Sequence, residues 1–243
     1  MRLLGIIMTY NDGDCIHNSI ECLLNSGHDV HVFDHGSTDM THKVLEKYPI
    51  NVIPVSRQEY PNFTVPGTNN IHHRVTTYIL SKRHEFDWVT WIDADEIILS
   101  HDKSDIKNDI KKANADGYQG LKSNIREYWC TETDDETETD YLKRIRNYVE
   151  LGCDYGGGIN RCWNIDITPT MTEATLRHTF FQGKHISPVK TILKHYPIRD
   201  INQGYNKINH DRQTYGGAGA HYASLRGSRS LKRSGNWGTK DVE

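Results

Sequence analysis

Two carboxylates stand one residue apart where an apolar run ends, in the stretch from Asp87 to Ile98. In an extended strand, Asp93 and Asp95 project to the same side because residues i and i+2 share a face, whereas Glu96 points to the opposite face and reads as structural. Paired carboxylates suit Mg²⁺ or Mn²⁺ bound to a substrate's phosphates. The alternative is a strand that runs into a polar turn. The stretch on its own leaves the two interpretations evenly matched.

The elements around this stretch favour the metal site. Apolar runs and helical periodicities alternate before it, which predicts strands at 3–8, 30–33, 51–55 and 88–92 with helices between them at about 16–24, 40–48 and 71–85. Each right-handed crossover packs a helix on one face of a sheet, so this order predicts an α/β fold with a doubly wound, mostly parallel sheet and helices on both faces.

Polar residues follow three of these strands. Ligands of open parallel sheets bind at the carboxyl ends of the strands. Residues 9–12 (Thr-Tyr-Asn-Asp), 34–39 (Asp-His-Gly-Ser-Thr-Asp) and 93–95 (Asp-Ala-Asp) should meet at that rim. The convergence predicts a site for a nucleotide and a cation.

Other observations narrow the class of protein. Neither G-x-G-x-x-G nor G-x-x-x-x-G-K-[ST] follows the first strand, so side chains and a metal must hold the phosphates. With 29 basic and 32 acidic residues the net charge is −3, which gives no field for nucleic acid or an anionic membrane. We expect a cytoplasmic protein without a transmembrane segment, and leave peripheral membrane attachment open. The scattered cysteines favour free thiols: Cys15, Cys22, Cys130, Cys153 and Cys162.

Three motifs in this order resemble a family 2 type glycosyltransferase with the GT-A fold. They are Met8-Thr9-Tyr10-Asn11-Asp12, the run Val32 to Asp39, which is close to V-x-D-D/N-G-S-x-D, and Trp91 to Glu96, which contains D-x-D in its D-A-D-E form. His35 departs from the acid or amide that is common at its position. The resemblance implies metal-dependent transfer of a sugar from a nucleoside-diphosphate sugar, with a UDP-sugar expected, to an acceptor hydroxyl with inversion.

The resemblance also assigns residues in the first half. It implies that Thr9, Tyr10 and Asp34, with Asn11 beside them, hold the nucleotide. Asp93 contacts the ribose or the metal, and Asp95 ligates Mn²⁺ or Mg²⁺. Arg74 is expected to reach the diphosphate, because guanidinium is permanently charged and forked. His72, His73 and His185 are expected to be ordinary structural or surface side chains.

The second half carries a segment similar to the H-Y-P-x-R-S…Q-x-x-x-K run of relatives, with Asp200 in place of Ser. The similarity implies His195 as a metal or phosphate contact. It implies Arg199 and Lys207 as cations that face the diphosphate, on or beside a helix expected from Asp200 to Arg212.

A catalytic base is expected in the acidic run 131–140. The stretch Thr133-Asp134-Asp135 resembles a Thr-Asp-Asp found in related sequences after an aromatic-rich stretch. An inverting transfer needs a carboxylate that accepts the proton of the attacking hydroxyl. Asp135 is the first candidate, with Asp134 and Asp154 behind it. The structural alternative is a solvated acidic loop.

The chain is expected to form a single GT-A domain over 1–222, with a nucleotide-sugar half at 1–100 and an acceptor half at 101–222. The stretch from Gly216 to Glu243 is rich in Gly, Ser and basic residues, and partial order is expected in it only near His221-Tyr222. The tail 223–243 is expected to be a mobile lid over the nucleotide site or a disordered end. The acceptor can be a glycan, a lipid-linked sugar or a protein. Two alternatives stay open, a nucleotidyltransferase of similar fold and a non-catalytic carbohydrate-binding protein.

Overall fold

The structure is a computed structural model that describes residues 1–60, 70–152, 159–168, 184–208, 232–234 and 237–241. The strands run over Leu3–Thr9 (β1), His28–Asp34 (β2), Asn51–Pro54 (β3), Trp88–Asp93 (β4), Glu96–Leu99 (β5), Gly120–Trp129 (β6), Asn147–Gly152 (β7), Ile159–Asn164 (β8), Ile186–Ile198 (β9) and Thr239–Lys240 (β10). The helices run over Ile16–Asn25 (α1), Thr41–Leu45 (α2), Ile71–Ser81 (α3), Lys107–Ala115 (α4), Tyr141–Arg144 (α5) and Ile201–Asn206 (α6). No described helix is long and apolar enough to span a bilayer.

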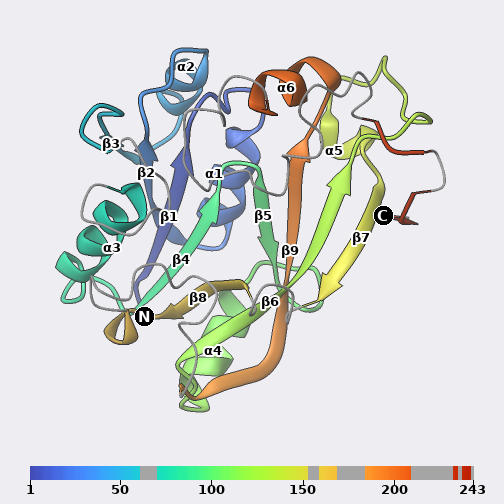
Figure 1. Cartoon of the computed structure of the whole chain (residues 1–243). Helices are drawn as coiled ribbons and strands as arrows, with labels where there is room; N and C mark the ends of the chain where they lie inside the picture. The colour runs from blue at the N-terminus through green and yellow to red at the C-terminus, as the bar shows by residue number, and fades with distance from the viewer. Residues whose placement is uncertain (61–69, 153–158, 169–183, 209–231, 235–236, 242–243) are drawn as a thin grey trace.

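The strands form one mixed sheet whose main order is β10-β7-β6-β8-β4-β1-β2-β3 (Figure 1). In the first half, β3, β2, β1 and β4 are all parallel neighbours. Antiparallel β8 then joins β4 to β6, and β9 pairs with β6 in parallel and with β5 in antiparallel sense. The predicted α/β fold is confirmed, and the second half extends the same sheet.

Helices cover both faces of the first half of the sheet, as predicted. Along β1, Leu3 and Ile7 face a core that also contains residues of α1 and α4. Leu4 and Ile6 face the opposite core, which contains the apolar side of α3. Alternate residues of one strand therefore enter different cores, which is why β1 is buried along its whole length.

Two predicted helices are shorter in the structure. The helix expected at 40–48 is reduced to α2, and Met40 is 58% exposed instead of packed. Asp39 accepts a hydrogen bond from the Thr41 backbone N–H at 2.9 Å, so the helix starts later than its apolar pattern suggested. The helix expected to reach about residue 85 ends at Ser81, and a turn held by Lys82 and Glu85 follows it.

Part of the C-terminal tail returns to the sheet. β10 pairs with β7, and the Asp241 carboxylate accepts hydrogen bonds from the Tyr128 hydroxyl at 2.5 Å and the Lys194 ammonium at 3.2 Å. His221 and Tyr222, where partial order was expected, lie outside the described residues. The described tail thus packs on the aromatic cluster at the ends of β6 and β9.

Candidate active site

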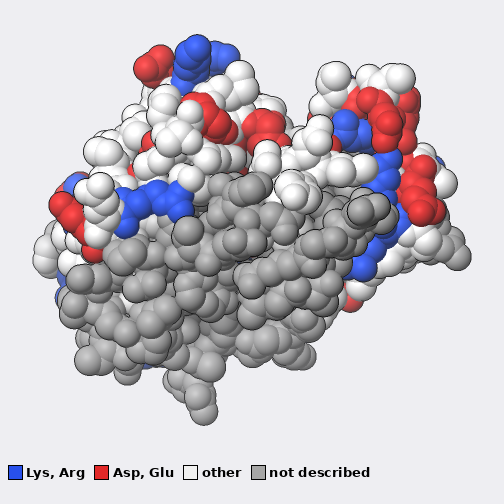
Figure 2. Space-filling view, turned by 45° about the horizontal axis from the view of Figure 1, so that its top comes forward, with Lys and Arg blue, Asp and Glu red and all other residues white. Residues whose placement is uncertain are grey.

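The carboxyl ends of β1 and β2 form one hydrogen-bonded rim. Thr9 and Asp34 are partners in the parallel register of these strands. Asp34 Oδ1 accepts from the Ser37 backbone N–H at 2.9 Å, and Asn11 Oδ1 accepts from the Thr38 backbone N–H at 2.8 Å. The structure therefore brings together Thr9, Asn11 and Asp34, which the sequence assigned to the nucleotide. Figure 2 turns this end forward and shows acidic and basic side chains mixed on its described surface.

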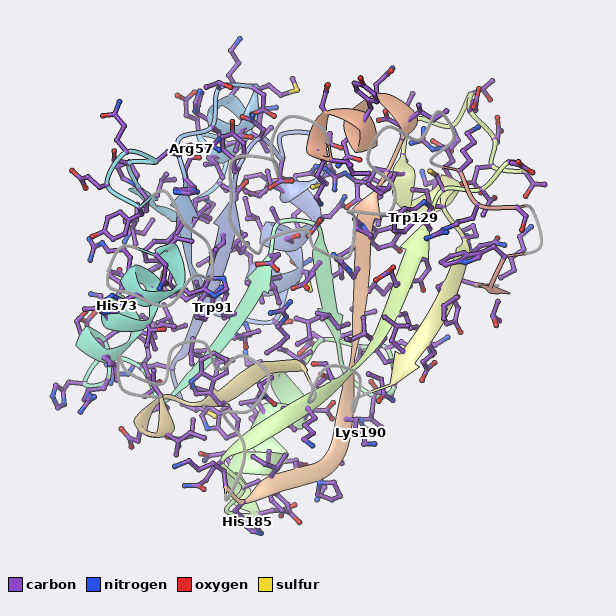
Figure 3. The ribbon with its side chains drawn as sticks, viewed as in Figure 1. Arg57, His73, Trp91, Trp129, His185 and Lys190 are labelled. Carbon is purple, nitrogen blue, oxygen red and sulfur yellow. The ribbon has the colours of Figure 1, made fainter. Side chains whose placement is uncertain are left out.

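Tyr10 lies against an arginine that sequence reasoning missed. The guanidinium carbon of Arg57 is 3.7 Å from the centroid of the Tyr10 ring, in cation–π geometry. Arg57 follows β3 and lies at the same end of the sheet (Figure 3). Gly36 has φ 74°, a left-handed conformation that favours glycine, and a Cβ there would be in ordinary contact with the Arg57 side chain at 3.5 Å. Because β3 is parallel to its neighbours, the strand-end rule could have found Arg57.

The two aspartates of D-A-D-E do not lie on one extended strand. β4 ends at Asp93, Ala94 and Asp95 form a turn, and Glu96 begins β5. The alternation of side chains along a strand predicted that Glu96 points away from the site, and this prediction is wrong. Glu96 Oε2 instead accepts a hydrogen bond from the Asp93 backbone N–H at 2.9 Å, because the turn reverses the chain. The geometric premise for its predicted structural role was therefore wrong.

Asp95 is surrounded by cations from the second half of the chain. Its Oδ2 lies 2.5 Å from Lys207 Nζ, 3.8 Å from His195 Nε2 and 3.9 Å from Arg199 Nη1. His195 reaches it from β9, in register with Glu96 of β5 on one side and Glu127 of β6 on the other. Lys207 follows directly after α6. The turn, β9 and the end of α6 thus assemble one charged site.

Burial and these charges shift several pKa values. Burial alone would raise the pKa of Asp95, but Lys207, His195 and Arg199 hold it well below its ordinary range. Burial opposes the charged form of His195, yet Asp95 and Glu127 raise its pKa. Asp12 moves the other way, because burial raises its pKa to about 6 against the attraction of Arg199. Perturbed groups gathered in one place are typical of functional sites.

Arg199 is 1% exposed and lies between acidic side chains. Its Nε and Nη2 donate to the two carboxylate oxygens of Asp14 at 2.6 and 2.8 Å, and its Nη1 donates to the Tyr196 carbonyl oxygen at 3.0 Å. Asp12 lies 3.6 Å from it. Arg199 therefore ties the loop after β1 to the end of β9, close to Asp95.

The donor set of the site fits a divalent cation. A carboxylate oxygen and an imidazole nitrogen are ligands that Mn²⁺ accepts. Two ligands at about 2.1 Å from one ion are about 3.0 to 4.2 Å apart, depending on the angle between the bonds, and Asp95 Oδ2 and His195 Nε2 are 3.8 Å apart. Within the described ranges no three His, Cys, Asp or Glu side chains gather around one point, so oxygens of a substrate would have to complete the coordination.

Within the described residues, no hydrogen bond or ion pair joins Asp95 to the remaining predicted residues, Arg74, Asp134 and Asp135. Arg74 is in the second turn of α3, a helix whose apolar side packs under the first strands. Asp134 Oδ2 accepts from the Thr131 backbone N–H at 2.8 Å, and Asp135 Oδ1 accepts from the Thr137 hydroxyl at 2.6 Å. Both acids thus order the loop after β6. Asp154 lies outside the described residues.

Two of the histidines that were expected to be structural or surface side chains, His72 and His185, have contacts that the structure describes. The His72 ring packs edge-on against Trp91, with ring centroids 5.3 Å apart. His185 lies 3.2 Å from the Gly117 carbonyl oxygen, at the end of the molecule opposite Arg57 (Figure 3).

No family model matches the chain. No curated protein matches it in sequence. Among solved structures, it is similar to glucosyl-3-phosphoglycerate synthase from Mycobacterium tuberculosis in complex with phosphoglyceric acid, at 16% identity and TM-score 0.45 over 80% of this chain and 70% of that one. The same enzyme with Mn²⁺ and UDP-glucose gives 16% identity and TM-score 0.45 over 80% and 69%. At this TM-score the similarity carries no argument about function, and the functional proposal below is built on this chain's own residues.

Proposed function

We propose that the chain is a metal-dependent glycosyltransferase of the GT-A fold. In this proposal it moves a sugar from a nucleoside-diphosphate sugar, with UDP as the expected nucleotide, to an acceptor hydroxyl with inversion. The observation that carries the proposal is the surroundings of Asp95. This buried carboxylate stands just past the carboxyl end of β4, with His195 Nε2 at 3.8 Å and Lys207 Nζ at 2.5 Å.

The rim of β1 and β2 is proposed to bind the nucleoside. Thr9, Asn11 and Asp34 already lie together there, and Tyr10 offers an aromatic ring beside the Arg57 guanidinium. An aromatic ring and a planar cation both suit the face of a base. Asp93 follows at the next strand end, with 35% of its side chain exposed, and is proposed to contact the ribose or the metal.

Asp95 and His195 are proposed to hold Mn²⁺ or Mg²⁺ together with oxygens of the substrate, and Asp93 would have to turn toward them to become a third protein ligand. When bound, the cation supplies positive charge that stabilises the leaving diphosphate. Lys207 adds a fixed cation beside it, and Arg74 and Arg199 are proposed to contribute further positive charge. Such charge helps most in the transition state, where the diphosphate gains its negative charge.

The proposed transfer is a single displacement. The acceptor oxygen forms a bond to the anomeric carbon, the bond from that carbon to the diphosphate oxygen breaks, and its electron pair leaves with the diphosphate. A carboxylate takes the acceptor's proton, and Asp135 is proposed for it with Asp134 as second candidate. Hydrogen bonds from Thr137 lower the pKa of Asp135, so its carboxylate is ionised but is a weaker base than an unperturbed aspartate.

A panel of nucleotide sugars tests this function. We expect slow, Mn²⁺-dependent release of nucleoside diphosphate from one member, and a rise in melting temperature with the same compound. A nucleotidyltransferase would instead release pyrophosphate from a nucleoside triphosphate and a sugar phosphate. If no nucleotide sugar in the panel is hydrolysed and none raises the melting temperature, the proposal is overturned.

A further inference from the structure

Arg161 occupies an irregular position in β8. Leu121 of β6 pairs with Cys162, but the next residue, Lys122, pairs with Asn160. Arg161 is therefore the extra residue of a β-bulge. On the other edge of β8, the pairing with β4 ends at Thr90 and Cys162, so it stops at the residue that follows Arg161 in the chain. Bulges bend a strand and redirect a side chain, and they are frequent beside active sites.

The redirected side chain reaches the D-A-D-E turn. Arg161 is 4% exposed, and its Nη2 donates to Glu96 Oε1 and lies 3.5 Å from Asp93 Oδ2. Glu96 is 2% exposed, and its second oxygen accepts from the Asp93 backbone N–H. Asp93 is thus held at its backbone by Glu96 and at its carboxylate by Arg161.

This arrangement is a poor device for stability alone. A buried ion pair commonly contributes no more than well-packed apolar residues of similar volume. Arg161 Nε is also buried without a hydrogen-bond acceptor in the described part of the chain. A buried donor without an acceptor is unfavourable, which points to a role other than stability for the guanidinium.

We propose that Arg161 is a positioning residue for the nucleotide-sugar site, acting with Glu96 on Asp93. The guanidinium neutralises Glu96 and fixes the Asp93 carboxylate, so that Asp93 meets its ligand already oriented. Partners that orient a ligating carboxylate typically change affinity by about 10- to 100-fold when removed. The inference rests on the proposed function, because it assigns Arg161 a role at that site.

The test compares Mn²⁺-dependent binding of UDP in four proteins by calorimetry. Arg161→Lys keeps the charge but lacks the planar guanidinium whose Nη2 contacts both carboxylates. The double variant Arg161→Met with Glu96→Gln leaves no buried charge unpaired and keeps an acceptor for the Asp93 N–H. Arg126→Lys is the control, because Arg126 is a partly buried β6 arginine that pairs with Glu150 away from Asp93.

We expect wild type and Arg126→Lys to bind alike, and both Arg161 variants to bind UDP about 10- to 100-fold more weakly while keeping a cooperative melt. A purely structural role would lower the melting temperature and leave the affinity of the folded protein unchanged, which overturns the inference. If wild type fails to bind UDP, the proposed function falls and the inference falls with it. Wild-type binding with unaffected Arg161 variants overturns the inference alone.

Discussion

At the scale of single residues, the ion pair between Asp95 and Lys207 occupies the carboxylate oxygen proposed to bind the metal. The Lys207 ammonium lies 2.5 Å from Asp95 Oδ2 and 3.1 Å from the Pro197 carbonyl oxygen. It therefore holds the carboxylate oxygen that a metal ion would take. An ion bound at this oxygen would displace the Lys207 ammonium toward another anion, and in the proposed function the diphosphate of the substrate would be that anion.

Lys207→Met should separate these two roles. Without the ammonium, free Mn²⁺ loses its nearest competitor at Asp95, so we expect its affinity in the absence of nucleotide to rise several-fold. The affinity for UDP with saturating Mn²⁺ should fall by about tenfold, the effect of one lost charged hydrogen bond. Calorimetric titrations with each ligand measure both changes.

Lys112→Met is the matched control, because Lys112 pairs with Asp116 on the surface of α4. It should leave both affinities unchanged. Opposite shifts in the Lys207 variant support the exchange, whereas parallel losses of both affinities would mean that Lys207 only supports the local structure.

The sequence predicted Asp95, His195 and Lys207 as members of one site because each lies in a motif or at a strand end. Arg57 and Arg161 were not predicted as site residues, for different reasons. Arg57 lies a few residues beyond a short strand with no motif around it. Arg161 belongs to a segment without a clear hydrophobic periodicity. Its proposed role depends on a β-bulge, which the residue pattern of the chain does not predict.

At the scale of elements, His28 joins α1, β2 and β4. The ring is 5% exposed, with Nδ1 3.2 Å from the Leu23 carbonyl oxygen and Nε2 2.9 Å from the Thr90 hydroxyl. We assign the Nδ1–H tautomer, in which Nε2 accepts from Thr90. Burial lowers the pKa of His28 to about 4. The neutral ring therefore stabilises this junction, and protonation opposes it.

This shift predicts a pH-dependent stability. The unfolded histidine binds a proton below about pH 6.5, while the folded one stays neutral down to about pH 4. The contribution is complete above about pH 6.5 and is lost as the pH falls toward 4, which amounts to about 2 to 3 kcal/mol at pH 4.5. Urea unfolding of wild type and His28→Gln at pH 7.5 and 4.5 measures it.

The variant is expected to be less stable at pH 7.5, because one of the two ring hydrogen bonds is lost, but to lose less stability on acidification. His84→Gln, at an exposed histidine after α3, controls for a general histidine effect. Curves for wild type and His28→Gln that run parallel between the two pH values would contradict the assignment.

Element prediction worked where periodicity was long. The apolar run of β1 correctly predicted a strand, and the apolar side of α3 correctly predicted a helix. The method failed at the D-A-D-E turn, because an alternating pattern does not reveal where a chain reverses. β8 was also missed, since its place between β4 and β6 depends on partners that lie far from it along the chain.

At the scale of the whole molecule, the predicted halves share one sheet and one site. β8 inserts between β4 of the first half and β6 of the second, and β9 lies beside β6 with β5 on its other edge. Asp95 and Lys207 are 112 residues apart in the chain but form a direct ion pair. The proposed binding sites for the metal and the diphosphate therefore form only when both halves fold together.

The most direct measurement is calorimetric titration of UDP into wild type and Asp95→Asn, each with Mn²⁺ and with EDTA. Asp116→Asn, at a surface carboxylate that pairs with Lys112, is the matched control. We expect wild type and the control to bind only with Mn²⁺, and Asp95→Asn to lose on the order of 100-fold in affinity while near-ultraviolet circular dichroism confirms its fold. Wild-type affinity in folded Asp95→Asn would contradict a metal site at Asp95 and the function built on it.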